Sequence, residues 1–89
     1  MSRKIKQDIS IGNNLRRLRK NAKLSQEEVA AQLNLMGIHV SREIISQIEL
    51  GRYSIRVSVL FALKELYKVN SFDEFFQGIS TQNDMVHYH

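Results

Sequence analysis

The sequence predicts an all-α fold, a compact bundle of five short helices. Apolar residues recur at helical spacing in five successive segments, and no stretch alternates apolar and polar residues between hairpin turn signals. With 89 residues, no proline and no internal repeat, the chain can build one hydrophobic core. We therefore expect one domain over residues 11–79, preceded by a basic N-terminal arm over 1–10 and followed by a flexible tail over 80–89.

Serine residues mark the predicted helix starts. A serine hydroxyl can accept a hydrogen bond from a free backbone N–H of the first helical turn. Ser25 and Ser71 are each followed three residues later by a glutamate, which is the spacing of a capping box. The serines that precede an apolar period are Ser10, Ser25, Ser41 and Ser71.

The helical period also predicts which side chains face the core. The first helix places on one stripe Ile11, Leu15, Leu18 and Ala22, and the second Val29, Ala30, Leu33 and Met36. The third, ending near Gly51, buries Ile45 and Ile48. The fourth, over about 57–68, offers Leu60, Leu63 and Tyr67, and a short fifth over 72–77 offers Phe72, Phe75 and Phe76. The third helix is left with an outward face of Glu43, Ser46, Gln47 and Leu50, flanked by Arg42.

The segment between the second and third helices is predicted to extend the second helix by about one turn. Gly37 then ends that helix, Met36 and Ile38 are core side chains, Val40 points inward and His39 points outward. The alternative is a loose surface insertion, which costs little because loop-closure entropy grows slowly with length.

Composition excludes several classes of function. The chain has no cysteine, so it has no disulfide, thiol nucleophile or cysteine-bound metal. It has no signal-peptide pattern and no apolar run near the 20 residues that span a bilayer, and we expect a cytoplasmic protein without membrane contact. No nucleophile elbow is present, and His87 and His89 form at most a weak metal site. We expect no enzyme activity and no cofactor.

Charge is distributed unevenly along the chain. Residues 1–56 carry eleven basic and five acidic side chains, a net charge of +6, whereas residues 57–89 have a net charge of −2. Such asymmetry in one domain is the expected mark of a face that binds a polyanion, although solvated surface charge alone explains it equally well.

Two segments match a known family pattern: LSQEEVA (24–30) and VSREIISQIELG (40–51), with IGNNLRRLRKNAK before them and SFDEFF (71–76) after them. With these segments the chain resembles the Cro/repressor-type or XRE-like helix-turn-helix family. The resemblance covers residues 11–77. It implies a five-helix, lambda-repressor-like bundle whose second and third helices bind double-stranded DNA, the third one in the major groove.

The resemblance also implies roles for single residues. The positions that read bases match Arg42, Glu43, Ser46 and Gln47, and Ser41 caps their helix. Phosphate contacts fall to Gln26, Arg52 and Arg56. A partly buried ion pair is expected between Arg19 and Glu49. The sequence departs from the family at the additional residues 35–39, at Leu50, where a polar or basic residue is common, and at Arg56, where a capping residue is common.

These observations indicate a sequence-specific transcriptional regulator, a repressor that binds a palindromic operator as a homodimer, with Phe61, Phe76 and Ile79 as candidates for the dimer seam. One alternative is an antitoxin-type DNA-binding protein that captures a toxin as its protein partner. Another is a protein-interaction adaptor that has lost DNA binding, for which Glu43 and Leu50 on the third helix are mild support.

Overall fold

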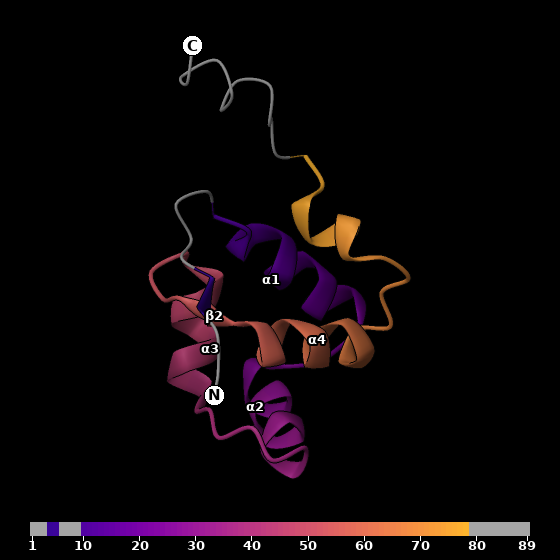
Figure 1. Ribbon diagram of the computed structural model, residues 1–89. Coiled ribbons are helices and arrows are strands. Elements are labelled where there is room, and N and C mark those ends of the chain that lie inside the picture. Colours follow the sequence, from indigo (N-terminus) through magenta and orange to yellow (C-terminus); the bar gives the residue numbers. More distant parts are fainter. Residues whose placement is uncertain (1–3, 6–9, 79–89) are drawn as a thin grey trace.

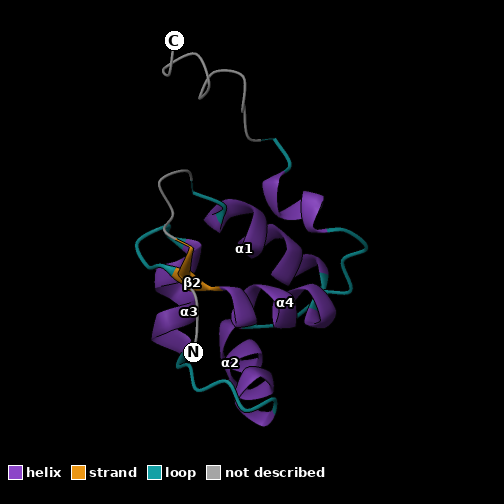
Figure 2. Ribbon diagram, in the orientation of Figure 1, coloured by secondary structure: helices purple, strands orange, loops and turns teal. Residues whose placement is uncertain are grey.

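The computed structural model describes residues 4–5 and 10–78, which fold around one core (Figure 1). The α-helices are α1 (Gly12–Asn21), α2 (Gln26–Leu35), α3 (Arg42–Glu49) and α4 (Val57–Leu66), and a 3-10 helix, η1 (Phe72–Phe76), follows them. α4 crosses the centre of the view, with α1 above it, α2 below it and α3 to its left (Figure 1). The strands β1 (Lys4–Ile5) and β2 (Ile55–Arg56) pair antiparallel, with Lys4 opposite Arg56 and Ile5 opposite Ile55 (Figure 2).

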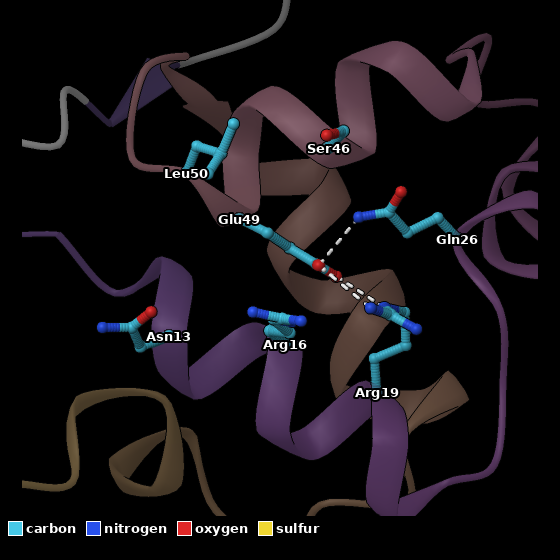
Figure 3. Close-up of a pocket in the computed structure, with 7 residues that line it drawn as sticks. All are labelled: Asn13, Arg16, Arg19, Gln26, Ser46, Glu49 and Leu50. Atoms are coloured by element: carbon cyan, nitrogen blue, oxygen red, sulfur yellow. Dashed lines mark hydrogen bonds and ion pairs between the residues drawn. The ribbon is translucent and has the colours of Figure 1, made fainter.

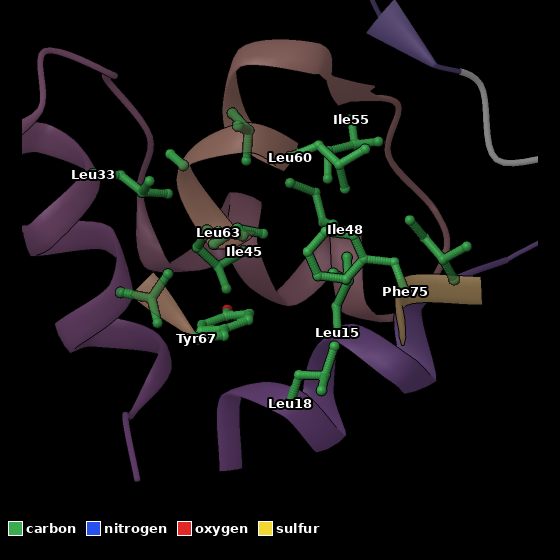
Figure 4. Packing of buried hydrophobic residues seen from close by; sticks show 14 of the residues in the cluster. Leu15, Leu18, Leu33, Ile45, Ile48, Ile55, Leu60, Leu63, Tyr67 and Phe75 are labelled. Atoms are coloured by element: carbon green, nitrogen blue, oxygen red, sulfur yellow. The ribbon is translucent and has the colours of Figure 1, made fainter. Parts of the chain in front are cut away.

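The core collects apolar residues of every helix (Figure 4), although Phe76, expected to face the core, is exposed, as is Met36. α3 contributes Ile45 and Ile48, and β2 contributes Ile55, which is completely buried. Tyr67, just after α4, is also buried, and this burial raises the pKa of its phenol. Each fully buried large apolar side chain adds about 1.5–3 kcal/mol to stability. The two inward isoleucines of α3 therefore fix which face of this helix remains outside.

The four α-helices of the described residues all end in the same hydrogen-bonded turn, the Schellman motif. At the end of α2, for example, the N–H of Ile38 donates to the carbonyl of Leu33, and Gly37 adopts a φ of +85°. Gly51 ends α3 in this way, but the equivalent positions after α1 and α4 are Lys23 and Lys68, with φ of 61° and 55°. Glycine adopts this left-handed backbone at no steric cost, whereas lysine is strained there.

The serine caps differ in detail from the prediction. The capping box of Ser25 and Glu28 is present, and the backbone N–H of Ser25 lowers the pKa of the Glu28 carboxyl. Ser41 accepts a hydrogen bond from the N–H of Ile44. Ser71 accepts one from Asp73, and Ser10 accepts one from Gly12 although the cap residue of α1 is Ile11. The N-cap of α4 is Arg56, without a side-chain bond, so this end lacks the usual cap.

Several expectations about the elements were wrong. The fifth helix is a single stretch of 3-10 helix rather than an α-helix, and α4 ends at Leu66, two residues before the expected boundary. The β1–β2 pair was not expected because two residues per strand are too few to show an alternating pattern. The tail, with His87 and His89, lies outside the described residues, as does Ile79.

The connection from α2 to α3 follows the prediction except at one residue. Ile38 and Val40 pack against the core, and His39 is exposed. Met36, expected in the core, is 46% exposed, because α2 ends at Leu35 and the chain turns away at Gly37 before the next inward position is reached. The segment is therefore anchored at two positions rather than three.

Candidate nucleic-acid interface

The outward face of α3 presents four polar side chains next to one another, and we call Arg42, Glu43, Ser46 and Gln47 the reading face. Arg42 and Glu43 are exposed at the start of the helix, while Ser46 and Gln47 are half-buried one turn later. Nη2 of Arg42 lies 3.4 Å from Oε2 of Glu43, and both side chains are mostly exposed to solvent. An exposed ion pair contributes at most about 1 kcal/mol, so both groups are available to a ligand at low cost.

Asn34 fixes the connection that orients α3. Its amide nitrogen donates to the carbonyl of Ala30 within α2 at 2.7 Å and to the carbonyl of Val40 at 2.8 Å. Together with the packing of Ile38, these two hydrogen bonds tie the chain just before Ser41 to the end of α2. The additional residues thus form an anchored turn. This role of Asn34 was not predicted, because a polar residue at an exposed position of a helix is common and indicates no particular contact.

A buried ion pair joins α1 to α3. Arg19 Nε donates to Glu49 Oε2 at 2.7 Å and Arg19 Nη2 to Oε1 at 3.1 Å, with side chains that are only 9% and 4% exposed (Figure 3). Nη1 of Arg19 donates to the carbonyl of Leu24 at 2.8 Å, so the same guanidinium also holds the turn before α2. The hydrogen bond to Glu49 raises the pKa of Arg19. The structure therefore brings together the two residues expected to pair, and they set the position of α3 on α1.

Gln26 extends this network to the first residue of α2. Its Nε2 donates to Oε1 of Glu49 at 3.0 Å, in a direction that Figure 3 shows pointing from α2 towards the ion pair. This contact with Glu49 was not anticipated for a residue expected to touch a phosphate. A primary amide carries two N–H hydrogens, and one of them suffices for Glu49. The second amide hydrogen and the carbonyl oxygen remain for a ligand.

The two arginines expected to contact phosphates lie beyond the end of α3. Arg52 follows the turn at Gly51 and is exposed, and its backbone N–H donates to the carbonyl of Gln47 at 2.9 Å. Arg56 is exposed in β2, at the N-cap of α4. The structure thus places them on the α3–α4 connection, outside the reading face.

Gly12 is a positioning residue that the sequence did not reveal. It is buried at the start of α1, where a Cβ atom would lie far inside van der Waals contact with the backbone carbonyls of Glu49 and Ile48. The backbones of α1 and α3 therefore touch directly at the C-terminal end of α3. Only glycine permits this approach, and a single sequence cannot show which glycine serves it.

This arrangement, in which one helix packs across a second that exposes a polar face, defines a helix-turn-helix domain. A helix-turn-helix family model matches residues 15–75, and the chain belongs to the Cro/XRE-type helix-turn-helix family. The family consists of DNA-binding domains that are typically non-enzymatic. Searches of curated proteins and of solved structures gave no significant match. Among the described residues, no helix is both long and apolar enough to cross a membrane.

Proposed function

We propose that this protein is a sequence-specific transcriptional regulator, a repressor that binds a palindromic operator as a homodimer. The observation that carries the proposal is the reading face on α3, held rigidly by the ion pair of Arg19 and Glu49 and by the anchored turn before Ser41. A rigid helix with adjacent polar side chains suits the major groove, where each base pair presents a distinct pattern of donors and acceptors.

Each side chain of the reading face has a chemically matched base edge. Arg42 can donate two hydrogen bonds to O6 and N7 of guanine, and Gln47 can pair with N6 and N7 of adenine. Glu43 can accept from N4 of cytosine, while Ser46 can pair with several edges. Phosphate contacts supply affinity without sequence preference, and we assign them to Gln26, the first residue of α2, and to Arg52 and Arg56 on the α3–α4 connection.

Two substitutions separate base reading from phosphate binding. On the preferred duplex, Gln47→Ala should weaken binding by about 1–3 kcal/mol and relax the preference at one or two base pairs per half-site. Arg52→Ala should weaken all duplexes alike and lower the slope of log K against log salt by about 1 per protomer. Titrations of labelled duplexes at four salt concentrations measure both effects. An unchanged base preference in Gln47→Ala would show that another surface reads the DNA.

The proposed dimer follows from the small number of base pairs that four side chains can specify. Phe61 and Phe76 are exposed and remain candidates for the seam, as does Ile79 outside the described residues. Footprinting should show two protected half-sites with centres about 34–36 Å apart. Protection of one half-site at saturating protein would refute the dimer. Co-purification of a stoichiometric partner would favour the antitoxin role, whereas the absence of any enriched DNA motif would favour the adaptor role.

A further inference from the structure

A polar hollow lies between α1 and α3, beside the reading face. It has a volume of about 410 Å³ and is lined by Asn13, Arg16, Ser46 and Leu50, together with the hydrogen-bonded group of Arg19, Glu49 and Gln26 (Figure 3). Ser46 and Gln26 also belong to the proposed DNA interface. The hollow is therefore continuous with the surface that faces the duplex.

Helix α1 turns two neighbouring arginines to different sides of the domain. Nη2 of Arg17 lies 3.3 Å from Oδ1 of Asn14 and 3.4 Å from Oε1 of Gln77, on the side where η1 packs. Arg16 lines the hollow on the side of α3 instead. Within residues 10–78, Arg16 makes no ion pair. Arg16 thus lies beside the hollow and the reading face, whereas Arg17 contacts Gln77 on another side of α1.

The charge of the hollow matches one phosphodiester group. Arg16 and Arg19 each carry one positive charge, and Glu49 carries one negative charge, so the lining has a net charge of +1. Arg19 already has Glu49 as its counter-ion, whereas Arg16, the other cation of this lining, has no ion-pair partner within the described residues. Asn13 beside it can add a neutral amide donor, and Leu50, 56% exposed, offers an apolar wall.

We propose that this hollow binds a phosphate of the DNA backbone, with Arg16 as its principal donor and Asn13 as a second one. The apolar side chain of Leu50 then packs against the deoxyribose of the same nucleotide, which explains a leucine at the exposed end of α3. The duplex thereby gains a contact to α1, and its backbone is held from α1 as well as from the α3–α4 connection. The proposal rests on the proposed function, since the phosphate belongs to the duplex that α3 reads.

The matched test compares Arg16→Gln with Arg17→Gln, two identical changes of charge on adjacent residues. On the preferred duplex, Arg16→Gln should lower affinity about tenfold and reduce the salt slope by about 0.9 per protomer. Arg17→Gln should retain the wild-type slope, because its side chain lies about 100° further around α1, towards Gln77 and away from the hollow. Equal slopes for the two variants would overturn the assignment. Thermal unfolding of both variants verifies that each is folded.

Duplexes with single methylphosphonate substitutions identify the phosphate. At one backbone position per half-site, removing the charge should weaken wild-type binding about tenfold and leave Arg16→Gln unaffected. Additive losses at every position would refute the contact. The alternative is a site for free phosphate. In that case inorganic phosphate, added at low millimolar concentration and constant ionic strength without DNA, would shift the Arg16 Nε–H resonance. Such a shift would also refute the contact with the DNA backbone. Failure of the proposed function is distinguished by the absence of any preferred duplex for the wild type.

Discussion

Replacing Glu49 by glutamine removes the charge at the centre of the α1–α3 contact and keeps its shape. The carboxylate accepts three hydrogen bonds, two from Arg19 at 2.7 and 3.1 Å and one from Gln26 at 3.0 Å. Glutamine has one acceptor oxygen and turns an NH₂ group towards these donors. The guanidinium of Arg19 would then be a buried charge without a counter-charge, and it would lose at least one of its bonds to residue 49 while keeping its bond to the carbonyl of Leu24.

The magnitude follows from the depth of the pair. Breaking a fully buried ion pair from one side costs about 3–5 kcal/mol. Because the side chains of Arg19 and Glu49 are still 9% and 4% exposed, we expect the lower end, about 3 kcal/mol. For a domain of this size such a loss lowers the melting temperature by roughly 12–24 °C. An apolar replacement of both partners would cost less, since no charge is then left unpaired.

Urea unfolding of the wild type, of Glu49→Gln and of Glu65→Gln measures this cost. Glu65 is exposed on α4, and its substitution makes the same chemical change without burial. We expect a lower midpoint with an unchanged m-value for Glu49→Gln, and a change below about 0.5 kcal/mol for Glu65→Gln. A destabilisation by Glu49→Gln no larger than that of the control would refute the role of the pair.

Three further predictions concern the frame of the domain. Gly12→Ala should destabilise the domain by about 1–3 kcal/mol, because the added methyl group meets the backbone of Glu49. The control, Asn21→Ala on the same helix, should be nearly neutral. Equal urea midpoints for the two variants would contradict the close approach of α1 and α3. Lys23→Gly should stabilise by about 0.5–1 kcal/mol by relieving a left-handed φ of 61°, and a loss of stability would show that this strain is absent. Burial raises the pKa of Tyr67 above its ordinary value of 10.0, so above pH 10 the unfolded chain loses this proton before the folded protein does. The contribution of Tyr67 to stability should therefore be full below pH 10, and above pH 10 stability should fall by up to about 1.4 kcal/mol per pH unit. Tyr67→Phe should lack the fall in unfolding free energy that the phenol causes above pH 10. Parallel curves of stability against pH for the two proteins between pH 9 and 11 would contradict this prediction.

The parts of the molecule that were predicted correctly depend on local patterns. The inward pair Ile45 and Ile48 follows from helical period alone, and it determines the outward face of α3. The cap at Ser41 and the left-handed Gly37 are also local features, and both are present. The pairing of Arg19 with a residue on α3 came from family resemblance rather than from any local pattern.

The parts that were missed depend on contacts between distant segments. Arg16 and Arg17 both lie outside the apolar stripe of α1, and only the packing of α3 and η1 on different sides of that helix separates them. Gly12 is needed only because the end of α3 passes over it. Met36 has the correct period for the core, but the chain leaves the helical path at the preceding residue. Each of these features depends on how two elements pack against each other, and the periodicity of a single helix does not predict that packing.

The central claim is that α3 reads the base sequence of duplex DNA. Selection from a random-sequence duplex library with the wild-type protein, followed by sequencing of the bound fraction, tests it most directly. We expect one enriched motif, an approximate palindrome whose half-sites lie one helical turn apart, about 34–36 Å between centres. A bound fraction with no enriched motif, at a salt concentration where the folded protein still retains duplex DNA, would contradict it.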